Sequence, residues 1–231
     1  MIAAVLVAAT LSGRSAVAAP SVCPPAPARA MPKGQALHGD LDGDGRVDSV
    51  VVTASYSSPP RCVFHLVARF ATGQASIASL PPSCLDVPCM REAHWPNVEA
   101  LAAIDRRPGA EIAVTVNAGA STLFLGIYTV KSQKLVRMAI PHSLQNTFAE
   151  FGSAARYDAV DCLGRTTGRV VASDVWVAGA RRVLVTRRFL RVVGMYFRVY
   201  RSVNYALRGL PRFPEFSGRG PFAHCLVARA R

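Results

Sequence analysis

The sequence predicts an all-β fold built from antiparallel sheets. Its apolar runs are short and rich in β-branched residues, and Gly, Pro, Ser or Asn residues separate one run from the next. Regularly spaced short strands with turns between them are typical of antiparallel all-β domains. The chain has 231 residues, which is enough for one domain with a substantial hydrophobic core.

Residues 1–18 are predicted to form a secretory signal peptide. Their apolar stretch is too short to span a bilayer, and Ala16-Val17-Ala18 follows as a small-x-small cleavage pattern. We therefore expect cleavage near Ala18 and a secreted, extracellular protein with no stable membrane insertion. Residues 19–35 are rich in Pro and Ala and should form an extended lead-in, and residues 36–231 should form a single all-β domain.

The strands of this domain are predicted from the short apolar runs between turn residues. The expected strands are 47–55, 62–70, 98–104, 110–116, 122–130, 134–140, 169–177, 183–190 and 195–205. One short helix is expected at 143–151.

The segment 40–48 has the spacing of a calcium loop. It reads Asp-Leu-Asp-Gly-Asp-Gly-Arg-Val-Asp, with carboxylates at its first, third, fifth and ninth positions. Such a loop can wrap side-chain and main-chain oxygens around Ca²⁺, which takes about six to eight oxygen ligands. The expected metal ligands are the carboxylates of Asp40, Asp42, Asp44 and Asp48 and the main-chain oxygen of Arg46. The alternative is an acidic surface turn that holds no ion.

The residues after the loop distinguish it from an EF-hand. An EF-hand needs a glutamate at its twelfth position and a helix on each side, whereas here the twelfth position is Val51 within a β-branched run. An Asp-rich turn that leads straight into a strand and ends on Asp48 resembles the cation-binding hairpin of FG-GAP and VCBS repeats. This resemblance implies calcium binding and the blades of an integrin-like β-propeller. The chain has room for about three blades, so we expect a small or partial propeller, with a β-sandwich as the alternative.

The residues 103–116 weakly repeat the first loop and its strand. Asp105, Gly109 and Glu111 occur in the same order, but Arg107 and Gly109 replace the two central carboxylates. We expect this second loop not to bind calcium. A third, fainter repeat is Phe151-Gly152-Ser153 followed by Asp158 and Asp161.

The cysteines are even in number, which favours disulfides in an exported chain. They are Cys23, Cys62, Cys84, Cys89, Cys162 and Cys225. The expected pairs are Cys84 with Cys89 and Cys162 with Cys225. Zinc bound at Cys62 and His65, or at His224 and Cys225, is the competing use.

The formal net charge is +13, and most of it lies late in the chain, where residues 152–231 hold fifteen arginines and four acidic residues. The excess suggests an anionic partner. We expect a surface made of Arg187, Arg188, Arg191, Arg198 and Arg201 that meets an anionic cell-wall or cell-surface polymer. Arginines interleaved with aromatic residues also occur on nucleic-acid surfaces, but export argues against a nucleic-acid partner. The alternative is an arginine-rich face that is only solvated.

The sequence shows no recognisable catalytic constellation. The five histidines are scattered, and neither a Gly-x-Ser-x-Gly elbow nor a glycine-rich phosphate loop occurs. We therefore expect a structural or binding module and not an enzyme. The alternative is a secreted hydrolase that has a structural calcium loop and an active site elsewhere.

Overall fold

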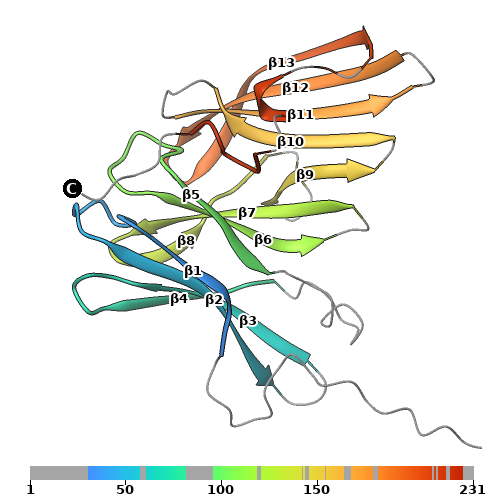
Figure 1. Ribbon diagram of the computed structural model, residues 1–231. Coiled ribbons are helices and arrows are strands. Elements are labelled where there is room, and N and C mark those ends of the chain that lie inside the picture. The colour runs from blue at the N-terminus through green and yellow to red at the C-terminus, as the bar shows by residue number, and fades with distance from the viewer. Residues whose placement is uncertain are drawn as a thin grey trace, which may run out of the picture.

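The computed structural model confirms an all-β, antiparallel architecture (Figure 1). It describes residues 31–57, 61–81, 96–118, 121–141, 143, 146–153, 155–163, 168–178, 182–209, 211, 213–216 and 219–225. The helical structure in these residues is limited to 3-10 turns, such as η2 (Pro214–Phe216). In this part of the chain, no helix has the length and apolar character needed to cross a bilayer.

The first sheet is a four-stranded antiparallel meander. Its strands, in spatial and chain order, are β1 (Met31–Gly39), β2 (Asp48–Ser57), β3 (Arg61–Arg69) and β4 (Ala75–Ser79). The β-branched residues of β2 alternate between the two faces, so Val50 and Val52 are fully buried beside Leu66 of β3. Figure 1 shows this sheet at the bottom, in blue to teal.

The second sheet has nine strands. They are β5 (Asn97–Ala102), β6 (Glu111–Ala118), β7 (Thr122–Lys131), β8 (Lys134–Arg137), β9 (Phe148–Ser153), β10 (Arg156–Cys162), β11 (Arg169–Val177), β12 (Arg182–Val193) and β13 (Tyr196–Arg208). The order is β13-β12-β11-β10-β9-β7-β6-β5. One half of β7 pairs with β9 and the other half pairs with β8, which lies off this path.

The two sheets share one core, and the larger sheet curls around a second. In the first core, Val52 and Leu66 pack with Ile112 and Val114 of β6, and β1 lies beside β5. In the second core, Phe148 packs edge-on against Phe197 and Phe222, with ring centroids 5.1 and 6.2 Å apart. The arrangement fits stacked blades or a sandwich. Each described sheet ends in edge strands, so neither sheet closes on itself.

Several local predictions differ from the structure. The helix expected at 143–151 is wrong, because Phe148–Ser153 is strand β9, which pairs with β7 and β10. Strands β1, β4, β9 and β10 were not predicted. Strand β1 begins at Met31, inside the segment expected to be a lead-in. The strand expected at 134–140 ends at Arg137.

Candidate functional site

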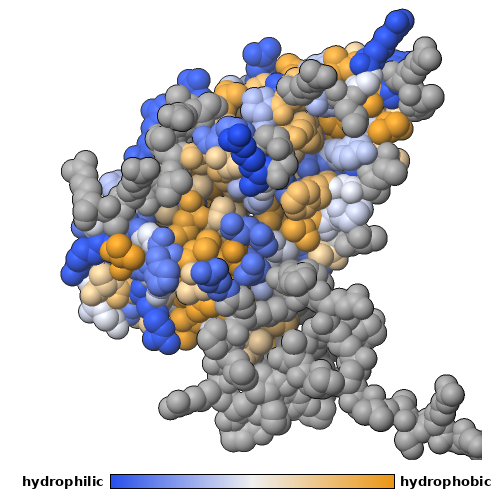
Figure 2. All heavy atoms as spheres, in the orientation of Figure 1, coloured by the Kyte–Doolittle hydropathy of each residue, from blue (hydrophilic) through white to orange (hydrophobic). Residues whose placement is uncertain are grey.

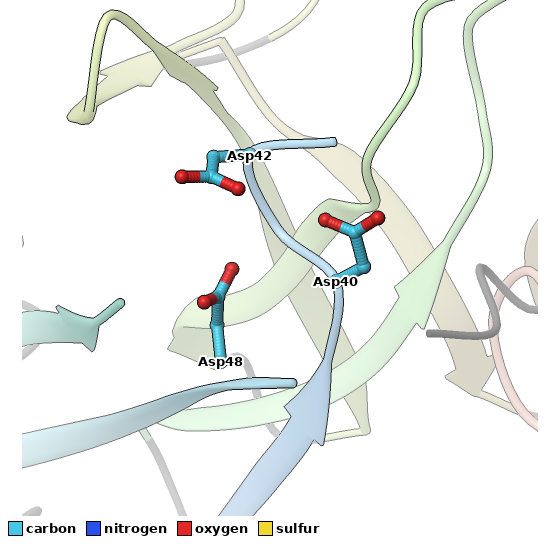
Figure 3. Close-up of side chains that lie close together, drawn as sticks. All are labelled: Asp40, Asp42 and Asp48. Atoms are coloured by element: carbon cyan, nitrogen blue, oxygen red, sulfur yellow. The ribbon is translucent and has the colours of Figure 1, made fainter. Parts of the chain in front are cut away.

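The Asp-rich loop joins β1 to β2 and places an acid at each side of the hairpin mouth. Asp40 directly follows β1, and Asp48 opens β2 opposite Gly39. One carboxylate oxygen from each of Asp40, Asp42 and Asp48 lies within 4.8 Å of the other two. Figure 3 shows the three side chains surrounding a common space. The geometry therefore brings together three of the five predicted calcium ligands.

Backbone amides donate hydrogen bonds to all three carboxylates, and Asp42 accepts one from the Asp44 amide at 3.2 Å. Asp40 accepts hydrogen bonds from the amides of Gly43 and Gly45, at 2.7 and 3.0 Å. Asp48 is 2% exposed and accepts hydrogen bonds from the amides of Leu41 and Ala71, both at 2.9 Å. A carboxylate has about four lone-pair positions, so both groups keep acceptor capacity for a cation.

The cluster concentrates negative charge. Burial raises the pKa of Asp42, and the charges of Asp48, Asp44 and Asp40 raise it further, against the lowering effect of the Asp44 amide. Carboxylates this close repel one another, because each ionised group disfavours ionisation of its neighbours. A bound cation would remove that repulsion.

Asp44 lies apart from the three converging acids. Its carboxylate accepts hydrogen bonds from the amide and the guanidinium of Arg46, both at 2.8 Å, and forms an ion pair with that guanidinium at 2.6 Å. The hydrogen bonds from Arg46 lower the pKa of Asp44. The Arg46 side chain extends into solvent. The sequence spacing predicts Asp44 as a calcium ligand, whereas the structure places its carboxylate outside the converging cluster.

The second loop is built on the same plan as the first. It joins β5 to β6, and Glu111 opens β6 as Asp48 opens β2. Glu111 accepts hydrogen bonds from the amides of Ile104 and Asp105, at 2.8 and 3.1 Å. The Arg107 guanidinium forms an ion pair with the Asp105 carboxylate, so this loop supplies its own cation. Burial and the charge of Asp105 raise the pKa of Glu111 to about 7.

The two loops are in direct contact. The amide of Ala110 donates a hydrogen bond to the main-chain oxygen of Asp40 at 2.9 Å. A methyl group on Gly109 would lie 2.7 Å from the oxygen of Leu41, so the backbones touch where both loops turn. The candidate metal site therefore lies at the junction of the two sheets.

The third predicted repeat forms no loop of this kind. Gly152 lies opposite Tyr157 in a tight connection between β9 and β10. Asp158 pairs with Arg156, whereas Asp161 accepts hydrogen bonds from the amides of Cys162 and His224. Among the described residues these acids belong to no metal-like cluster.

The five predicted anion-binding arginines divide into two groups. Arg187 forms an ion pair with Glu215 at 2.8 Å, and Arg188 forms one with Asp174 at 3.0 Å. As neighbours on β12, these two side chains point to opposite faces of the sheet. The other three, Arg191, Arg198 and Arg201, are exposed, and no ion pair joins them to an acid within the described residues. We call these three residues the arginine surface.

A carboxylate pair was not predicted from the sequence. Asp158 of β10 and Asp174 of β11 lie directly opposite each other, between Arg156 and Arg188. They line a cavity of about 300 Å³. Burial raises the pKa of Asp158 to about 7, and the hydrogen bond and charge of Asp174 add to the effect. The pKa of Asp174 is lowered because the hydrogen bond from Asp158 and the two arginines outweigh its burial.

One predicted disulfide is confirmed. Cys162 and Cys225 are bonded, with their Cα atoms 5.0 Å apart. The alternative of zinc at His224 and Cys225 is therefore wrong, since the Cys225 sulfur is in the disulfide and the His224 ring contacts Asp161. Cys23, Cys84, Cys89, the side chain of Cys62 and the predicted leader lie outside the described residues.

Comparisons of the chain with protein-family models, with curated proteins and with solved structures give no match.

Proposed function

We propose that this chain is a secreted calcium-binding module of the FG-GAP/VCBS kind, in which Ca²⁺ stabilises the β1–β2 hairpin. The proposed role is structural or binding, towards an acidic extracellular or cell-surface partner. The observation that carries the proposal is the convergence of Asp40, Asp42 and Asp48 from the two ends of one hairpin.

The donor set favours calcium over softer metals. All three converging ligands are carboxylates, and hard cations such as Ca²⁺ prefer oxygen. No sulfur or imidazole ligand belongs to the cluster in the described part of the chain. Asp44 and the main-chain oxygen of Arg46 remain predicted ligands. For Asp44 this requires exchanging its ion pair with Arg46 for the cation.

The comparison of the two loops explains what the ion would do. In the second loop Arg107 forms an ion pair with Asp105, whereas in the first loop no guanidinium of the described residues forms an ion pair with the three converging carboxylates. Because the loops touch through Asp40 and Ala110, a cation in the first loop would strengthen the contact between the two sheets.

The proposal of an acidic partner is supported by the arginine surface. Arg191 and Arg198 lie opposite each other on β12 and β13, and the Arg201 guanidinium lies 5.6 Å from the ring centre of Phe189. Figure 2 shows strongly hydrophilic side chains standing out at the top of the molecule, over the end of the sheet that holds β12 and β13. Exposed guanidiniums without acidic neighbours attract anionic polymers.

Thermal unfolding with calcium and with chelator tests the proposal. A ligand that binds only the folded state raises stability by about 2.7 kcal/mol when its concentration is about 100 times Kd. We expect millimolar calcium to raise Tm by several degrees, and an equal concentration of magnesium to raise it less. A Tm that is the same in calcium and in chelator would contradict the proposed ion.

A second candidate function is acid–base hydrolysis, and it is favoured by one observation. Asp158 is buried and Asp174 half-buried at a cavity, and their pKa values differ. This is a common arrangement for a general acid and its partner. A screen of chromogenic glycosides, esters and phosphate esters tests it. Turnover that is lost in Asp158→Asn would establish this candidate, and no turnover of any substrate would count against it.

A further inference from the structure

We propose that a basic pocket on the second sheet binds an anion carrying two or more phosphate groups. The pocket lies where the loop 103–110 meets the β10–β11 and β12–β13 turns. This inference rests on the acidic-partner part of the proposed function and narrows it to a ligand class, and it does not depend on the calcium ion.

The pocket is large and strongly positive. It has a volume of about 630 Å³, and its charged lining residues are Arg106, Arg107, Arg169, Arg191 and Asp105. Four guanidiniums and one carboxylate give a formal charge of +3. The Asp105 carboxylate is already ion-paired with the Arg107 guanidinium. No ion pair joins Arg106, Arg169 or Arg191 to an acid within the described residues.

Two of these arginines lie in a row that crosses three strands. Arg169 of β11 is directly opposite Arg191 of β12, which is directly opposite Arg198 of β13. Residues opposite each other share a face of the sheet, and like charges in such positions repel. Within the described residues no ion pair to an acid offsets these three guanidiniums. An anion bound between them would remove the repulsion.

The walls of the pocket are fixed to each other. The amide of Gly168, in the β10–β11 turn, donates a hydrogen bond to the oxygen of Ile104 at 2.7 Å. A methyl group on Gly168 would lie 3.2 Å from the side chain of Arg106, so this arginine packs closely over the glycine next to Arg169. Arg107 also contacts the Met195 sulfur beside the β12–β13 turn. Arg106 and Arg107 are therefore held at the pocket before a ligand arrives, which reduces the entropic penalty of binding for these two side chains.

The residue type favours phosphate. A guanidinium presents a planar fork of donors that matches two oxygens of a phosphate or a carboxylate. Three forks from two walls can engage more oxygens than one planar carboxylate offers, whereas a diphosphate presents several in different directions. The volume exceeds that of a single phosphate group, and the exposed ring of Tyr200 lines the remaining space.

Calorimetric titration with inorganic pyrophosphate tests the inference. The full-length mature protein is titrated at low salt with a calcium chelator present, because pyrophosphate itself binds calcium. We expect one pyrophosphate per chain. In Arg169→Gln/Arg191→Gln the affinity should fall about tenfold or more, since each variant side chain loses a charged hydrogen bond.

The matched control is Arg182→Gln/Arg208→Gln. These two arginines are also directly opposite each other, on β12 and β13, but nine residues of β12 away from Arg191, a distance of roughly 30 Å. The two double variants have the same net charge. The control should bind pyrophosphate within about twofold of wild type. An equal loss in both variants would overturn the inference, because it would show an effect of overall charge alone.

Two further measurements test the pocket without relying on the variants. Pyrophosphate should shift the NMR amide resonances of Gly168 and Gly194 in the wild-type protein, a test that needs no variant. Absence of both heat and shifts would overturn the inference. Dextran sulfate distinguishes the pocket from the acidic-partner proposal. Binding of dextran sulfate without binding of pyrophosphate would overturn the pocket and support only the arginine surface. Binding of pyrophosphate without binding of dextran sulfate would support the pocket alone.

Discussion

Arg46 binds one of the four carboxylates of the first loop. Its guanidinium and its amide both bind Asp44, while Asp40, Asp42 and Asp48 converge on one another. Sequence spacing alone treats all four acids as equivalent. The separation of Asp44 depends on a side chain two positions further on.

The variants Asp42→Asn and Asp44→Asn test this division. Asp42→Asn removes a converging carboxylate and relieves the repulsion that raises its pKa. We expect calcium affinity to fall about tenfold or more, with stability in chelator unchanged or slightly higher. The measurement is a calcium titration followed by calorimetry, with urea unfolding in chelator.

Asp44→Asn is the matched control, because it makes the same charge change in the same loop. Its effect on calcium affinity should be the smaller of the two. If Asp44→Asn abolished binding and Asp42→Asn left it intact, Asp44 would be the principal ligand and the described cluster would not be the site.

The raised pKa of Glu150 predicts how the free energy of unfolding depends on pH. Burial raises the pKa of Glu150 to about 8, although the amide of Val160 donates a hydrogen bond to its carboxylate. The folded state therefore keeps a proton that the unfolded state has already lost. The stability from this group is complete below its ordinary pKa of 4.5 and is lost progressively as the pH rises to about 8.

Glu150→Gln removes this titration while it keeps an oxygen to accept the Val160 hydrogen bond. We expect the variant to match wild type near pH 5 and to exceed its free energy of unfolding by roughly 2–5 kcal/mol at pH 9. Urea unfolding at both pH values measures the difference. A difference that does not change with pH would show that Glu150 titrates normally.

At the scale of the elements, the loop contact is what places the first hairpin against the second. Gly109 has a φ of +101°, and a methyl group there would lie 2.7 Å from the oxygen of Leu41. Gly45 has a similar φ of +83° but open space around it. Substitution of Gly45 therefore tests backbone strain alone, whereas substitution of Gly109 tests strain together with a collision between the loops.

Gly109→Ala should destabilise the protein by about 2 kcal/mol or more beyond Gly45→Ala, which carries only the left-handed penalty of about 1–2 kcal/mol. Gly109→Ala should also weaken the calcium response, because Asp40 lies at the contact. Urea unfolding of both variants gives the comparison. Equal losses would mean that the loops separate without consequence for the fold.

The Cys162–Cys225 disulfide fastens the C-terminal segment to β10, across a sequence separation of 63 residues. Closing a loop of that length stabilises the folded state by about 4 kcal/mol, through the entropy of the unfolded chain. Cys162→Ala/Cys225→Ala should therefore lower the free energy of unfolding by about that amount. Wild-type stability of the double variant under oxidising conditions would show that the bond contributes nothing.

Across the whole molecule, the sequence predicts those strands that their own local composition identifies. Arg169–Val177 matches its prediction at both ends, because its β-branched residues alternate between turn residues. Strands β9 and β10 were missed because they contain Glu150, Asp158 and Asp161, which are uncommon in strands. Their acids accept hydrogen bonds from groups distant in sequence, such as the His224 amide, which donates to Asp161.

The candidate sites also divide into one that local sequence encodes and others that depend on residues distant in sequence. The Asp-rich loop is predictable because its ligands lie within nine consecutive residues. The Asp158–Asp174 pair forms only when β10 pairs with β11 in the observed register. The basic pocket forms only when separate hairpins meet, as in the hydrogen bond from Gly168 to Ile104. Whether four-stranded units close into a propeller also depends on contacts between distant strands, which local periodicity does not encode.

A crystal structure of the protein grown in calcium, with anomalous scattering data, tests the central claim most directly. The account predicts a peak bounded by the carboxylates of Asp40, Asp42 and Asp48, with oxygen distances of about 2.3–2.6 Å. Side chains turned towards solvent with no peak between them, at a calcium concentration that saturates extracellular modules, would contradict it.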